Sequence, residues 1–181
     1  GRFIMLTTIL ALLIVQQAPA SSSPPAPPSI TCEGEGFDAF DFWIGEWDVF
    51  PTGGDTKVSQ SVIERLYGGC AIRENWMPAR GHPGGSLSSY DAETGRWHQT
   101  WVGGRGRVEF EGGAVDLGER GQGMVLTGYW PDVGGPGRDG LIRMTYSRND
   151  DGSVRQHGEA SFDHGLSWVD SFDFTYRRRS D

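Results

Sequence analysis

The stretch DFWIGEWDVF, residues 41–50, is the most specific pattern in this chain. From Glu46 onward it alternates polar and large apolar residues, which is the period of a strand with one buried face. If Trp47 points inward, Gly45 and Trp43 point inward as well. We therefore expect a strand over Phe42–Phe50 whose inner face starts the hydrophobic core.

The rest of the chain repeats short apolar stretches of this kind. Its 28 glycines fall in clusters between them, which is typical of many short strands joined by turns. A short helical turn is expected over Phe37–Phe40, and Val58, Val62 and Leu66 leave a helix possible for the second element. The expected strands are Phe42–Phe50, Lys57–Leu66, Ala71–Met77, Ser86–Tyr90, Trp97–Val102, Val108–Glu111, Met124–Trp130, Leu141–Ser147, Val154–Ser161 and Trp168–Arg177.

The links between these strands have the composition of hairpin turns. Residues 91–95, 149–152 and 163–165 are rich in Asn, Asp and Gly, which tolerate the left-handed backbone of tight turns. Ten strands in up-and-down order, without helical crossovers, favour a closed barrel because closure removes exposed edges. We expect an all-β fold: a closed antiparallel up-and-down barrel of about ten strands.

The stretch SFDHGLSW, residues 161–168, resembles the Asp-box hairpin that is repeated around sialidase propellers. A propeller needs such a hairpin several times at a fixed period, and the chain contains it once. We therefore interpret it as a folding device. Asp163 is expected to bind turn amides, Gly165 to take the left-handed conformation, and Trp168 to pack under the hairpin.

Several motifs occur together in one order: FWIGEW at 42–47, GGC at 68–70, YDAETGRW at 90–97, QTW at 99–101 and RMT at 143–145. Together they resemble an uncharacterised bacterial family of exported, lipocalin-like domains in the calycin superfamily, over about residues 37–178. The resemblance implies a calycin-like barrel in which Trp47 closes the base under Arg177, Arg178 or Arg179. It implies no catalytic residues.

A more distant similarity is to nitrobindin, a haem-binding barrel of ten strands. Its haem is held by a histidine near the C-terminus, and the last strand here, SWVDSFDFTYRRR, contains none. The four histidines are His82, His98, His157 and His164, and no two stand at a metal-ligand spacing. We expect neither a metal nor a cofactor.

The N-terminal region indicates export. Phe3–Val15 is a short apolar run, and Ala18-Pro19-Ala20 supplies the small residues of a cleavage site. We expect a secretory signal peptide over 1–20, a disordered Ser/Pro-rich linker over 21–36 and the barrel domain over 37–179. The expected location is periplasmic or extracellular.

Export permits a disulfide between Cys32 and Cys70, the two cysteines of the chain. The alternative is a free Cys32 and a buried Cys70, and spacing alone does not decide between them. The formal net charge of −8 disfavours nucleic acid and anionic lipid as partners. We expect a monomer that has no membrane contact after signal cleavage.

A barrel of this size holds one small ligand among its inward side chains. The more ordinary interpretation is that the aromatic residues simply fill it. Because alternate residues of a strand point to the same face, we expect three groups of side chains each to share one face of their strand. The groups are Trp97, Gln99 and Trp101; Met144 and Tyr146; and Trp168, Phe172 and Phe174. The candidate ligand-binding residues are Trp76, Gln99, Trp101, Arg143, Tyr146, Gln156 and Trp168.

Glu74 and Arg143 each lie in a strand among apolar neighbours. If both point inward, they must pair or bind something, because a lone buried charge is costly; the interpretation we favour is that both face solvent. The expected function is to bind a small apolar or amphipathic molecule. One alternative is an enzyme, a hydrolase or isomerase using Glu74, Arg143 or a histidine, and another is haem binding.

Overall fold

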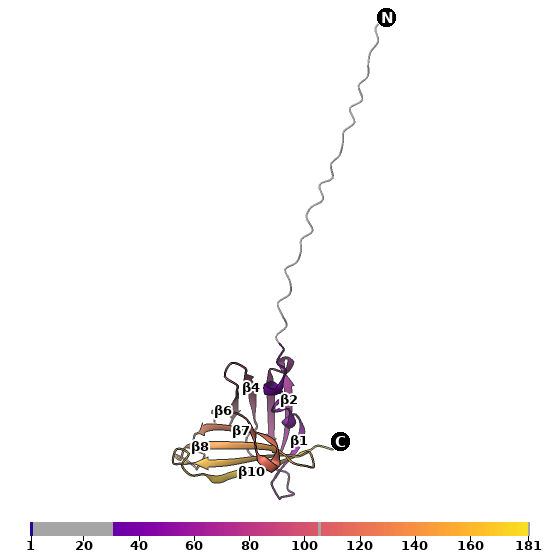
Figure 1. Ribbon diagram of the computed structural model, residues 1–181. Coiled ribbons are helices and arrows are strands. Elements are labelled where there is room, and N and C mark those ends of the chain that lie inside the picture. Colours follow the sequence, from indigo (N-terminus) through magenta and orange to yellow (C-terminus); the bar gives the residue numbers. More distant parts are fainter. Residues whose placement is uncertain (2–30, 105, 181) are drawn as a thin grey trace. The chain divides into compact units, whose positions relative to one another are not determined.

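The computed structural model describes Gly1, residues 31–104 and residues 106–180 (Figure 1). The expected signal peptide and the linker up to residue 30 lie outside these ranges, apart from Gly1. Within them, Cys32 is buried and the helix α1 spans Glu35–Asp38. The folded domain therefore begins before residue 37, where the sequence placed its boundary, and it includes the last part of the expected linker.

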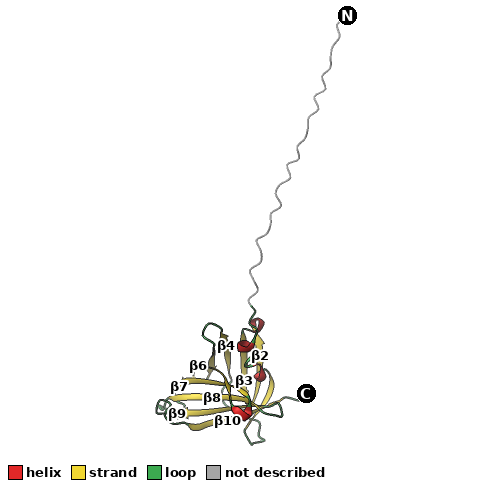
Figure 2. Cartoon of the chain, in the orientation of Figure 1, coloured by secondary structure: helices red, strands yellow, loops and turns green. Residues whose placement is uncertain are grey.

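All ten expected strands are present, and strands make up most of the described chain (Figure 2). The second element is a strand, not a helix. The first strand starts later than expected, because Asp41–Trp43 forms the 3-10 helix η1. The strands are β1 Gly45–Pro51, β2 Ser59–Leu66, β3 Ala71–Pro78, β4 Gly84–Asp91, β5 Arg96–Gly103, β6 Gly106–Asp116, β7 Gln122–Trp130, β8 Gly140–Arg148, β9 Val154–Ser161 and β10 Val169–Arg178; two further 3-10 helices, η2 Tyr67–Gly69 and η3 Gly118–Arg120, lie between strands.

The strands form a closed antiparallel barrel in up-and-down order, of the calycin-like kind expected. Each strand pairs with the next along the chain, and β1 pairs with β10 to close the circle. In Figure 1, β8 and β10 run across the view whereas β2 and β4 stand nearly upright, as tilted strands around a barrel do. Closure gives every strand two neighbours, so the sheet has no free edge.

One end of the barrel is filled by the segment that precedes β1. Phe40 stacks on Trp43 at 4.9 Å between ring centroids and meets Tyr146, near the end of β8, at 4.9 Å. The rings of Phe40 and Trp43 are fully buried. The indole nitrogen of Trp47 donates to the Trp43 carbonyl at 2.9 Å, which ties η1 to the start of β1.

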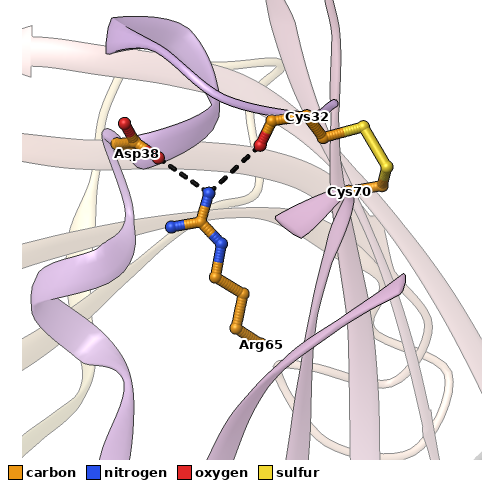
Figure 3. Close-up of a disulfide and its surroundings, with 4 residues drawn as sticks. All are labelled: Cys32, Asp38, Arg65 and Cys70. Carbon is orange, nitrogen blue, oxygen red and sulfur yellow. Dashed lines mark hydrogen bonds and ion pairs between the residues drawn. A yellow bond between two sulfur atoms is a disulfide. The ribbon is translucent and has the colours of Figure 1, made fainter. Parts of the chain in front are cut away.

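A disulfide holds this plug in place. Cys32 and Cys70 are bonded, with 4.8 Å between their Cα atoms, which decides between the two alternatives that the sequence left open (Figure 3). Beside it, the Arg65 guanidinium donates to the Cys32 carbonyl at 3.2 Å and to the Asp38 carboxylate at 2.7 Å. The covalent bond and the arginine together fix the chain before β1 to the end of β2 and the start of β3.

The Gly-x-Trp pair of β1 has a physical explanation in the structure. The Arg178 guanidinium lies over the Trp47 ring at 4.1 Å, which confirms the expected cation–π contact and selects one of the three candidate arginines. Gly45 has φ 149°, and a Cβ atom there would lie 1.8 Å from Arg178 Nη1. Glycine at this position therefore leaves the space in which the arginine packs.

The hairpin between β9 and β10 forms as the sequence predicted. The Asp163 carboxylate accepts from the Ser167 amide at 2.9 Å, and Gly165 has φ 88°. The Trp168 indole nitrogen donates to the Gly165 carbonyl at 3.1 Å. The motif therefore acts as a turn-forming device. Separately, no helix in the described residues is long and apolar enough to cross a membrane.

Candidate ligand-binding site

The barrel contains a cavity of about 230 Å³. Its walls come from seven strands and are mostly aromatic, with a minority of polar groups. Because successive side chains in a strand point to opposite faces, every second residue of these strands reaches the interior. The lining residues are Glu74, Trp76, Gln99, Trp101, Phe110, Trp130, Met144, Tyr146, Gln156, Phe172, Phe174 and Tyr176.

The interior carries small hydroxyl side chains beside large rings. Inward positions of β2 and β4 carry the buried serines Ser59, Ser61, Ser86 and Ser88. Trp76, on β3 between these two strands, meets Phe174 at 5.7 Å, and Phe172 stacks on Phe174 at 5.5 Å, while Phe110 meets Trp130 at 5.8 Å. Small serines beside large rings leave the space that a uniformly apolar core would fill.

Glu74 is the central polar group of the cavity. It is 5% exposed, and its carboxylate accepts from Ser61 and Ser86, each at 3.2 Å, and contacts the Tyr176 hydroxyl at 3.4 Å. Burial raises the pKa of Glu74 from 4.5 to about 7, while the three hydroxyl groups act in the opposite direction. The carboxyl group therefore changes charge near neutral pH.

A chain of hydrogen bonds leads from Glu74 across the cavity floor. The Tyr176 hydroxyl donates to Gln156 Oε1 at 2.7 Å, and Gln156 Nε2 donates to the Tyr146 hydroxyl at 2.9 Å. A tyrosine has one hydroxyl proton, and the short bond to Gln156 uses it. The contact from the Tyr176 hydroxyl to the Glu74 carboxylate, at 3.4 Å, is therefore the weaker of its two interactions.

Five of the seven sequence-predicted residues come together in this cavity: Trp76, Gln99, Trp101, Tyr146 and Gln156. Gln99 is held by a bond of 3.0 Å from its Nε2 to Ser88 Oγ. The expectation that Trp97, Gln99 and Trp101 share one inner face agrees with their burial and register, as does that for Met144 and Tyr146. The cavity is therefore built on the faces that the alternation indicated.

The other two predicted residues, Arg143 and Trp168, lie outside the cavity. The Arg143 guanidinium packs over the Trp168 ring at 4.2 Å and pairs with Glu159 at 2.9 Å. The expectation that Trp168 shares a face with Phe172 is wrong, because an irregularity between Asp170 and Phe172 adds one residue to β10. One extra residue turns the side chains that precede it to the opposite face of the strand.

The expectation that Glu74 faces solvent is also wrong, whereas Arg143 does face outward. The sequence contains a signal for both. Glu74 stands two residues before Trp76, so an inward Trp76 places Glu74 on the same face. By the same rule, Arg143 stands next to the inward Met144 and must point out. The lining residues that sequence reasoning left out of the candidate site are Glu74, Phe110, Trp130, Met144, Phe172, Phe174 and Tyr176.

The residues present do not fit haem in the nitrobindin manner. None of the four histidines lines the cavity. His157, which lies on β9 and pairs with Asp173 of β10, forms a bond of 2.9 Å with Asp170, whose side chain is exposed. No group of three His, Cys, Asp or Glu side chains in the described residues is placed to hold a metal ion.

The geometry supports two kinds of chemistry. The rings can cover an apolar body, and the carboxyl, amide and hydroxyl groups can bind a polar end or exchange a proton with it. Neither a protein-family model nor a curated protein matches this chain. The resemblance seen in the sequence motifs therefore stays a prediction, and the argument for function rests on the cavity itself.

Proposed function

We propose that this protein is an exported barrel that binds one small apolar or amphipathic molecule in its interior. The observation that carries the proposal is the cavity of about 230 Å³, lined by aromatic rings and a few converging polar groups. Ligand sites in proteins have this composition: mostly hydrophobic walls and a small number of placed polar groups that set orientation.

The size of the cavity limits the ligand. A dry apolar cavity of about 150 Å³ accepts benzene, and pockets for drug-sized molecules start at about 300 Å³. A volume of about 230 Å³ lies between these two values. The ligand we propose therefore has one ring, or an equivalent aliphatic body, and a short polar substituent.

The unequal distribution of polar groups favours an amphipathic ligand over a purely apolar one. Glu74, Gln99 and Gln156 are buried and each offers a hydrogen-bonding group to the interior. A hydrocarbon ligand would leave them with their protein partners alone, whereas a polar substituent gives them a further partner. The rings of Phe110, Trp130 and Phe172 then cover the apolar part.

Two further observations support an exported, monomeric carrier. The Cys32–Cys70 disulfide suits an oxidising compartment. The barrel is closed, so no sheet edge is available for pairing with a second chain. These observations agree with the signal peptide that the N-terminal residues predict.

The first test is calorimetric titration of the purified protein with 2-phenylethanol, a neutral one-ring probe of the proposed size. We expect saturable binding of one molecule per chain. The Phe110→Trp variant, which enlarges an inward ring, should bind at least about tenfold more weakly because it fills the cavity. Leu87→Trp is the matched control, since Leu87 lies on β4 with its side chain 44% exposed.

Native mass spectrometry of the purified protein complements the titration, because mass that is lost on denaturation identifies a retained ligand. The proposal fails if 2-phenylethanol and similar one-ring probes give no saturable heat. It also fails if Phe110→Trp and Leu87→Trp bind the probe equally well, because binding would then lie elsewhere on the molecule.

A second candidate function is enzymatic, and Glu74 is the observation that favours it. A carboxyl group whose pKa is about 7 can both give and take a proton at neutral pH, as a general acid or base must. Its contact with Tyr176 supplies a second proton-carrying group at 3.4 Å. The reaction would be an isomerisation or hydrolysis of a small molecule held in the cavity.

The test of this candidate is a screen for turnover of small esters and carbonyl compounds, repeated on Glu74→Gln and on Glu64→Gln. Glu64 lies on β2 with its side chain 40% exposed, paired with Arg73. Turnover that disappears in Glu74→Gln and persists in Glu64→Gln supports the enzyme. Turnover that is equal in both variants excludes Glu74 from the reaction.

A further inference from the structure

Glu74 has no cationic partner. Among the described residues that line the cavity, it is the only one that is charged at neutral pH. The titratable groups that face it are two tyrosines, Tyr176 from β10 and Tyr146 from β8, and burial raises the pKa of both well above 10. The groups from β2 and β4 are the hydroxyls of Ser61 and Ser86. The protein therefore supplies hydrogen bonds to this carboxylate but no compensating charge.

A carboxylate in such a place is costly for the protein by itself. Removing an ion from water costs several kcal/mol unless a partner of opposite charge and further hydrogen bonds compensate it. The hydroxyl donors around Glu74 are long, at 3.2 to 3.4 Å. The described residues therefore stabilise a negative charge here only weakly, and a cation from outside the chain would supply the missing counterion.

Large aromatic rings flank the carboxylate. Trp76 follows Glu74 by two residues on the same face of β3, so it stands one step along the strand. Glu74 pairs with Ser86, and Ser86 pairs with Trp101 on the next strand. A positive group that contacts Glu74 lies between these two indoles, which attract cations through their ring faces.

We propose that the cavity selects a small organic cation: an ammonium group on an aromatic or apolar body, with the ammonium at Glu74 and the body among the rings of the opposite wall. This inference rests on the proposed function and names the ligand class of the same site. The ammonium donates to the Glu74 carboxylate, and the indoles of Trp76 and Trp101 lie beside it.

The same arrangement disfavours anionic and neutral ligands relative to a cation. An anionic ligand would place a second negative charge beside Glu74, with no cationic side chain in the described lining to offset it. A neutral ligand would leave Glu74 as it is in the free protein. The formal net charge of −8 also raises the local concentration of cations around the molecule.

Binding of the cation should be coupled to ionisation of Glu74. The pKa of this group is about 7 in the free barrel, whereas an alkyl amine stays protonated up to about pH 10. Below pH 7 the ligand must displace the Glu74 proton. The apparent affinity for an amine should therefore be about 30-fold lower at pH 5.5 than at pH 8, while that for a neutral analogue should not fall.

The test is calorimetric titration of the purified protein with three probes that share one ring: 2-phenylethylamine, 2-phenylethanol and phenylacetate. At pH 8 we expect the amine to bind at least about tenfold more tightly than the alcohol, and the anion to bind most weakly. In Glu74→Gln the amine should lose this preference and bind like the alcohol. Glu64→Gln removes the same charge from an outer position and should keep the preference.

The pH series on the unaltered protein keeps the test decisive if Glu74→Gln does not fold. An amine preference that fades as the pH falls through about 7 supports the inference. If the alcohol binds and the amine binds no better at any pH, the cation inference is overturned and the small-molecule barrel stands. If no probe binds, both the inference and the proposed function fail.

Discussion

Replacing Glu74 with Gln should stabilise the barrel at alkaline pH. Burial raises the pKa of Glu74 in the folded protein from 4.5 to about 7. The folded state therefore binds the proton more tightly than the unfolded chain does. This contribution to stability is fully present below about pH 4.5 and is lost as the pH rises through about 7. Gln is the neutral analogue of the protonated side chain, so Glu74→Gln removes this contribution to the pH dependence of stability.

The magnitude follows from these pKa values. The full difference between 4.5 and about 7 corresponds to about 3 kcal/mol in the free energy of unfolding. At pH 8 Glu74 is ionised in both states, so Glu74→Gln should raise the free energy of unfolding by about 3 kcal/mol. At pH 5 the folded group is already protonated, and the gain should fall to about 1 kcal/mol.

The assay is denaturant unfolding of the protein and of Glu74→Gln at pH 5 and pH 8, without ligand. Comparing the two proteins at each pH cancels the titration of all other groups. Glu64→Gln is the control, because an exposed ion pair contributes at most about 1 kcal/mol. A Glu74→Gln variant that is destabilised equally at both pH values would refute the argument, since the carboxylate would then stabilise the fold.

Further predictions concern the end of the barrel that the segment before β1 fills. Reducing the Cys32–Cys70 disulfide, which closes a loop of 38 residues, should lower the free energy of unfolding by about 4 kcal/mol in the chain-entropy account. Denaturant unfolding with and without reductant measures this difference. An unchanged free energy of unfolding would contradict the role given to the disulfide in fixing the segment before β1. Gly45→Ala should cost about 2–4 kcal/mol, because the new Cβ meets Arg178 at a strained φ. Gly113→Ala, with nothing within 4 Å of its added Cβ, should be neutral or slightly stabilising when both variants are compared by thermal unfolding; equal melting temperatures for the two variants would refute the packing argument.

Much of the fold follows from local chemistry. Alternation located all ten strands, and turn residues located the hairpins, because both depend on neighbouring residues alone. The Gly45-x-Trp47 pair indicated the arginine contact, and the structure selects Arg178 for it. The disulfide was left open, since spacing between cysteines carries no information on the distance between their Cα atoms.

Two different causes explain the errors in the candidate site, and the first is a change in which face of β10 its side chains occupy. The extra residue between Asp170 and Phe172 turned Trp168 outward, and nothing in the sequence marks that irregularity. The orientations of Glu74 and Arg143 could be inferred from the sequence, because the inward faces of Trp76 and Met144 already determine them. The prior that charged residues face water outweighed the alternation, and the functional group of the cavity was missed for that reason.

The cavity itself is a property that sequence patterns do not contain. Whether inward rings fill a barrel or leave space depends on how side chains from seven strands meet. Here small serines of β2 and β4 lie beside Trp76 of β3, and a cavity of about 230 Å³ remains open. The buried carboxyl group beside this space is the feature on which the proposed ligand class depends.

The most direct test of the small-molecule barrel uses the seven tryptophans of the chain. Trp76, Trp101 and Trp130 line the cavity, whereas the other four do not. Titration with 2-phenylethanol, followed by the indole N–H signals in nitrogen-15 NMR spectra, distinguishes the two sets. The account predicts saturable shifts at Trp76, Trp101 and Trp130 and little change at Trp168. Shifts confined to Trp168, or no saturable shift at any indole, would contradict it.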